Sequence, residues 1–128
     1  MTQPLIFIST SRIKEVGLEG YKAYTRKMVE LIKENEPRLL GFGTYVNEDG
    51  SKATTVQIHP DADSMIFHMQ FIREKMASAF EFLELESVTF CGQLDDQALR
   101  IAKQISGTGV DLSVNSQLLG GFTRLASD

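Results

Sequence analysis

The chain of 128 residues contains no tryptophan, a single cysteine and only two histidines. The lone cysteine, Cys91, excludes a disulfide within the chain, so the reducing cytoplasm is the expected compartment. The formal net charge of -4, with no basic cluster, argues against a nucleic-acid-binding protein. No apolar run approaches the roughly 18 residues that a membrane helix needs, so no membrane partner is expected.

What is present is the composition of a globular domain, with 42% hydrophobic and 23% charged residues. Hydrophobic periodicity and turn residues divide the chain into strands and helices. Strands are expected at 5–13, at 38–60 as a hairpin and at 84–94; helices at 18–37, 61–83 and 95–106; and an irregular or strand-like tail at 110–125. The order β-α-β-β-α-β predicts an α+β fold of the ferredoxin-like type with a C-terminal helix and tail. Residues 1–94 would be the basic unit, and residues 95–128 an extension of the same domain.

Individual residues mark the ends of these elements. Pro37 ends the first helix, and Asp61 or Asp63 can cap the second. The sequence NEDG (47–50) supplies the hairpin turn, with Gly50 suited to a positive φ angle. These residues place the element boundaries independently of the hydrophobic pattern.

The predicted sheet has four antiparallel strands with both main helices on one face. Its strands carry apolar or small residues on both faces instead of a clean alternation with polar ones. The face without helices would therefore need a cover. The simplest cover is a second copy of the chain, which predicts a homodimer through the open sheet face.

Both histidines, His59 and His68, lie within 56–71, the first at a strand end and the second inside a predicted helix. At about 100° per residue, His68 falls roughly 60–80° from the centre of that helix's buried stripe, at the edge of the core. Two histidines without a nearby cysteine do not make a zinc signature, so no metal site is expected. An imidazole beside an apolar pocket could act as a general base. Plain packing residues are the other interpretation of both side chains.

The spacing of several residues resembles a known pattern. Glu36-Pro37 precedes the second strand, and His59, Asp61, Met65, His68 and Met69 follow the third strand at the spacing of a family motif. On these residues the chain, over about 5–94, resembles the antibiotic biosynthesis monooxygenase-like family of the dimeric α+β barrel superfamily. One departure is that His59 stands where the family often has tryptophan.

The resemblance implies a cofactor-independent monooxygenase that binds a small, mostly apolar or aromatic molecule between helices and sheet. His68 and His59 would be its catalytic residues. The polar and aromatic lining would come from Tyr45, Tyr24, Tyr21, Phe71, Ser9 and Ser11. Two alternatives stay open. One is a non-catalytic dimer that binds a metabolite or a partner protein. The other is haem binding through His68, which the missing tryptophan disfavours.

Overall fold

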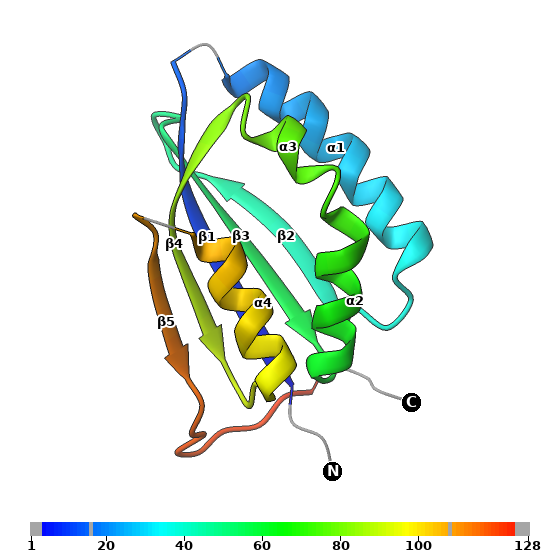
Figure 1. Cartoon of the computed structure of the whole chain (residues 1–128). Helices are drawn as coiled ribbons and strands as arrows, with labels where there is room; N and C mark the ends of the chain where they lie inside the picture. Colours follow the sequence, from blue (N-terminus) through cyan, green and yellow to red (C-terminus); the bar gives the residue numbers. More distant parts are fainter. Residues whose placement is uncertain (1–3, 16, 108, 125–128) are drawn as a thin grey trace.

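Strand β1 (Leu5–Ile13) lies at the centre of a five-stranded sheet (Figure 1). The structure is a computed structural model, and it describes residues 4–15, 17–107 and 109–124. The sheet order is β2-β3-β1-β4-β5. The other elements are α1 (Leu18–Asn35), β2 (Gly41–Val46), β3 (Lys52–His59), α2 (Ala62–Ile72), α3 (Met76–Ala79), β4 (Leu83–Cys91), α4 (Asp96–Ser106) and β5 (Asp111–Asn115). This α+β ferredoxin-like arrangement confirms the predicted fold class.

The first four strands pair antiparallel, and β5 adds parallel to β4. The register places Ser9 opposite Thr55 of β3, and Thr55 opposite Thr44 of β2. Between β1 and β4 the register shifts after Thr10, so that Ser11 pairs with Leu85 and one residue of β4 is skipped.

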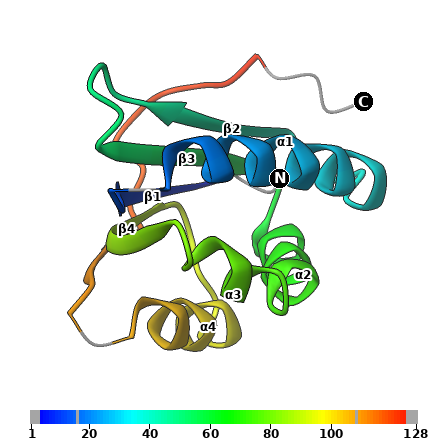
Figure 2. The same ribbon diagram turned by 90° about the horizontal axis from the view of Figure 1, so that it is seen from above.

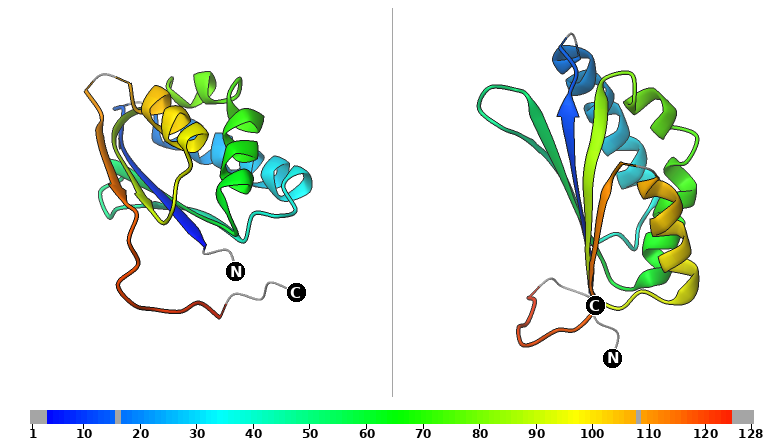
Figure 3. Two further views of the ribbon diagram at one scale, coloured as in Figure 1. Left: turned by 60° about the horizontal axis from the view of Figure 1, so that its bottom comes forward. Right: turned by 60° about the vertical axis from the view of Figure 1, so that its left-hand side comes forward.

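Helices α1, α2, α3 and α4 lie on the same face of the sheet, and no described helix covers the other face (Figure 2; Figure 3, right). The main core lies under α2 and α4, where Met65 and Met69 pack with Phe7 and Phe90 of the sheet. Two smaller cores lie under α1. Within the described part of the chain, no helix combines the length and the apolar character that crossing a membrane requires.

Local residues start and stop these elements as the sequence predicts. The Asp61 carboxylate caps α2 by accepting a hydrogen bond from the backbone N–H of Ser64, and Asp95 caps α4 in the same way. Gly50 adopts φ 73° in the hairpin turn, a backbone angle that favours glycine.

Three expectations are corrected. The helix predicted at 61–83 is broken: α2 ends at Ile72, because β4 already begins at Leu83, paired with Ile13, and the chain must turn before it. The last strand of the unit ends at Cys91 and not at residue 94. The sheet has five strands instead of four, because part of the tail pairs with the free edge of β4. The fifth strand depends on a pairing with β4 that local sequence does not encode.

Candidate functional site

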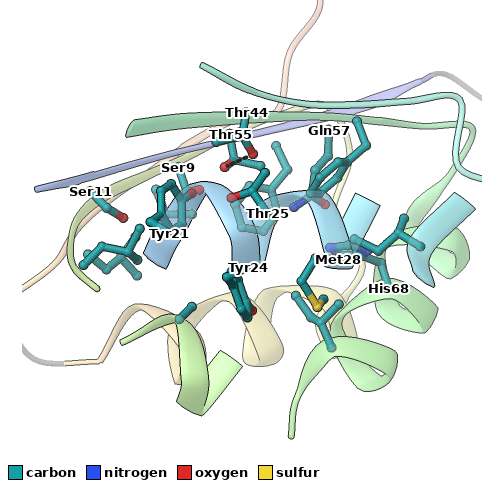
Figure 4. A pocket seen from close by; sticks show the side chains of 18 of the residues that line it. Ser9, Ser11, Tyr21, Tyr24, Thr25, Met28, Thr44, Thr55, Gln57 and His68 are labelled. Carbon is teal, nitrogen blue, oxygen red and sulfur yellow. Dashed lines mark hydrogen bonds between the residues drawn. The ribbon is translucent and has the colours of Figure 1, made fainter. Parts of the chain in front are cut away.

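A cavity of about 120 Å³ lies between the helices and the sheet and is partly open to solvent. Its floor is the inward face of β1, β2 and β3, and its walls come from α1, α2 and the α3–β4 segment (Figure 4). The lining is mostly apolar. Its polar members are Ser9, Ser11, Tyr21, Tyr24, Thr25, Thr44, Thr55, Gln57 and His68. None of the described residues that line it is Lys, Arg, Asp or Glu. The cavity therefore suits a neutral molecule with a few oxygen atoms.

At one end of this cavity, the His68 ring is fully buried and held by a carboxylate. Its Nδ1 lies 2.9 Å from both Oε1 and Oε2 of Glu36, which is itself only 5% exposed. A carboxylate only accepts hydrogen bonds, so Nδ1 carries the proton and donates it. The prediction that His68 lies at the edge of the core is wrong, because Glu36 and the Phe42 ring, 5.9 Å away, close over it.

Glu36 reaches this position because α1 ends there. Glu36 is the C-cap residue of α1, and its backbone N–H still donates to the Ile32 carbonyl. Pro37 follows and cannot continue the helix. The chain leaves the helix axis at this point, and the Glu36 side chain turns under α2 toward His68.

The other ring nitrogen of His68 has no such partner. Among the buried side-chain nitrogen and oxygen atoms of the described residues, only His68 Nε2 has no hydrogen bond. Since Nδ1 holds the proton, Nε2 presents a lone pair. The ring extends from α2 toward the cavity that it lines (Figure 4). The arrangement is a buried imidazole with a carboxylate on one nitrogen and no partner on the other, in a side chain that lines the cavity.

The second histidine belongs to a separate hydrogen-bonded chain. His59 is fully buried; its Nδ1 lies 2.8 Å from Ser64 Oγ, and its Nε2 lies 3.0 Å from Gln57 Oε1. The His59 ring is 5.7 Å from the His68 ring. Burial lowers the pKa of His59 from 6.5 to about 3, with a smaller contribution in the same direction from His68.

This lowered pKa predicts acid sensitivity. In the unfolded chain His59 binds a proton below about pH 6.5, whereas in the folded chain it stays neutral until about pH 3. Its contribution to stability is therefore complete above pH 6.5 and is lost as the pH falls, by about 1.4 kcal/mol per pH unit. Urea unfolding over this range should show a shallower pH dependence for His59→Gln than for the wild-type chain. Equal slopes for the two proteins would contradict the prediction.

Four of the residues expected to bind ligand line the cavity: Tyr21, Tyr24, Ser9 and Ser11. The Tyr24 hydroxyl donates to the Lys75 carbonyl at 3.1 Å, and burial raises the pKa of Tyr24. The hydroxyls of Ser9 and Ser11 have no hydrogen-bond partner among the described residues, so they are free to bind a ligand oxygen.

Three other candidates lie outside the lining. Tyr45 is 65% exposed on the outward face of β2. Phe71 stacks on Phe67 with ring centroids 6.5 Å apart, and the Lys75 ammonium lies 4.3 Å from its ring centre. His59 lies behind Gln57 and does not line the cavity. Within the described ranges, no three His, Cys, Asp or Glu side chains converge as a metal site would require.

Sequence reasoning gave no role to two side chains of the site. In the sequence, Glu36 is only part of a family pattern at a helix end, and no motif marks Gln57. A signal for Gln57 exists, because it has the same strand parity as His59 and Thr55 and so faces the helices. No local signal could pair Glu36 with a residue 32 positions later.

Comparison with known proteins finds no matching family model and no matching curated protein. Solved structures do match. MupZ from Pseudomonas fluorescens has a TM-score of 0.75 at 22% identity, covering 97% of this chain and 91% of MupZ. Rv0793 from Mycobacterium tuberculosis has a TM-score of 0.62 at 16% identity, covering 73% and 98%. A protein named "putative Antibiotic biosynthesis monooxygenase" from Chloroflexus aurantiacus has a TM-score of 0.57 at 8% identity, covering 73% and 95%. The chain therefore shares the antibiotic biosynthesis monooxygenase-like fold.

Proposed function

We propose that the cavity binds a small, neutral, mostly apolar or aromatic molecule and that His68 acts on it as a general base. The observation that carries this proposal is the buried imidazole with Nδ1 held by Glu36 and Nε2 left without a partner at the cavity. Removing a proton from a phenol or an activated methylene leaves an anion, and His68 becomes an imidazolium stabilised by the adjacent carboxylate.

The reaction would be an oxygenation, as the name of one matched structure, "putative Antibiotic biosynthesis monooxygenase", suggests. It would proceed without a cofactor. For an activated methylene, the substrate anion reduces O₂ directly. One oxygen atom enters the product as a carbonyl, the other leaves as water with the two methylene hydrogens, and the substrate supplies all the electrons. The apolar walls, including Met28, Ile32 and Met69, would shield the anion from water.

The test is oxygen uptake by the purified protein with a panel of anthrone-type and phenolic substrates. Uptake in proportion to product carbonyl would support the proposal. Binding of these compounds without any uptake would instead indicate the non-catalytic ligand-binding alternative. Haem binding would use the same His68 Nε2, so a Soret shift on adding hemin would favour haem binding over cofactor-independent oxygenation.

We also propose that the open sheet face pairs with a second copy of the chain. Side chains alternate along a strand, so Ile6 and Ile8 of β1 and Val56 and Ile58 of β3 point away from the helices, and none of the four is fully buried. In the tail beyond β5, Leu118, Leu119 and Phe122 are exposed by 61%, 103% and 78%. This much exposed apolar surface is typical of an interface.

The expected result is a particle of twice the chain mass in sedimentation equilibrium at micromolar concentration. Ile8→Lys places a charge at the centre of the open face and should shift the protein toward a single-chain particle. Glu34→Lys, on the exposed side of α1, serves as the control and should leave the mass unchanged. A wild-type protein that sediments as one chain would contradict the pairing.

A further inference from the structure

From the contacts around His59 we infer that Gln57 donates the hydrogen bond that holds the ligand oxygen deprotonated by His68. The inference rests on the proposed function and adds a second group to its site. Gln57 is 4% exposed and lines the cavity together with His68. A ligand for such a site carries an ionisable oxygen, as a phenol or an enol does.

The direction of the hydrogen bonds follows from satisfying every buried group. The only partner of the Ser64 hydroxyl among the described residues is His59 Nδ1, so the hydroxyl donates and Nδ1 accepts. The His59 proton must then be on Nε2, which donates to Gln57 Oε1. The opposite tautomer carries the His59 proton on Nδ1. It would leave the hydroxyl proton of Ser64, a residue only 4% exposed, without an acceptor.

This chain leaves the Gln57 amide nitrogen free. With Oε1 occupied by His59, both Nε2 protons lack a partner among the described residues, and the nitrogen is not fully enclosed. Figure 4 shows the side chain extending from β3 into the cavity, on the same side as His68. An amide held at its oxygen and free at its nitrogen is a fixed donor.

Neighbouring contacts place this donor close to the base. Gln57 is paired with Phe42 in the sheet register, and the Phe42 ring lies 5.9 Å from the His68 ring. The His59 ring, which is hydrogen-bonded to Gln57, lies 5.7 Å from the His68 ring. When His68 Nε2 takes the proton of a ligand hydroxyl, the negative charge that remains on the oxygen would accept from Gln57. The proton moves to Nε2, and no other bond breaks.

His59 is a positioning residue in this arrangement. It touches no ligand, but it fixes which end of the Gln57 amide faces the cavity. Nε2–H can donate to Gln57 Oε1 in either protonation state, but only the neutral ring also accepts from the Ser64 hydroxyl and so satisfies both of its partners. Burial keeps His59 neutral by lowering its pKa to about 3.

The experiment uses nitrophenol as the probe, since its anion has its own visible absorption. In the wild-type protein, the bound probe should ionise at a lower pH than the free probe. Gln57→Glu keeps the shape but replaces the donor with an acceptor. It should raise the pKa of the bound probe and weaken binding of the anion by about 100-fold, the lower end of the effect of losing one oxyanion donor. Nitrobenzene, which has no hydroxyl, should bind both proteins alike.

Matched variants separate the possible outcomes. Gln70→Glu makes the same chemical change on the exposed face of α2 and should leave the probe unaffected. Adding His59→Gln to Gln57→Glu should cause no further shift in probe ionisation, because His59 acts through Gln57. Suppose that wild-type protein binds the probe, that His68→Asn raises the pKa of the bound probe and that Gln57→Glu does not. The role of Gln57 is then refuted, while the proposed role of His68 stands. If wild-type protein does not bind the probe, the proposed function fails with it.

Discussion

Oxygen uptake by the His68→Asn variant is expected to fall by about 10²- to 10⁴-fold, the usual contribution of a positioned general base. Asparagine can place an amide N–H near the position of Nδ1, so the Glu36 carboxylate keeps a donor and the fold is spared a buried, unpaired charge. What the variant lacks is the unpaired Nε2 of His68, the proposed base.

Three measurements make this result specific to the base. Affinity for a substrate analogue should change only a few-fold, because the apolar walls remain. Added imidazole should restore part of the uptake by entering the space that the ring has left. The unfolding midpoint shows whether the variant is folded. Undiminished uptake by a folded His68→Asn protein would refute the role of His68, whatever the substrate.

Replacing Glu36 with alanine is expected to lower the free energy of unfolding by about 2–3 kcal/mol. The variant leaves the His68 Nδ1–H group without an acceptor inside the core and removes a hydrogen bond to a carboxylate. Glu36→Gln keeps an acceptor at the same place, so it should cost less than about 1 kcal/mol. Urea unfolding at neutral pH measures all of these differences.

Glu34→Ala is the matched control, since Glu34 lies two residues earlier on the exposed side of the same helix. It should change stability by no more than about 0.5 kcal/mol. Glu36→Gln should still lose activity, because an amide stabilises an imidazolium less than a carboxylate does. Equal stability losses for Glu34→Ala and Glu36→Ala would mean that the buried contact adds nothing to the fold.

The order of elements was predictable from the sequence because its signals are local. The capping carboxylate of Asp61, the turn glycine Gly50 and the stop at Pro37 each act within a few residues. The break after Ile72 was not predictable, since the apolar pattern continues through the turn. The position of β4 depends on the pairing of Leu83 with Ile13, a contact between distant parts of the chain.

The candidate site was predictable only in part, for the same reason. The position of His68 on its helix was visible in the sequence, but its burial depends on Glu36 and Phe42, which arrive from other elements. The two histidines suggest a pair, whereas the structure gives each one its own partners. His68 is bonded to Glu36, while His59 is bonded to Gln57 and Ser64. Hydrogen-bond partners across strands and helices set these roles, and periodicity does not report them.

The register shift that skips Glu86 in β4 keeps a negative charge out of the cavity. With an unbroken register, Ser11 would stand opposite Glu86, and a carboxylate would enter the apolar floor in place of Leu85. Because of the shift, Glu86 points outward and pairs with Lys52 at 2.9 Å. Deleting one residue from this stretch would exchange the two faces of the strand beyond that point. A cavity that now has no charged side chain in its described lining would then repel the very anion that His68 is proposed to create.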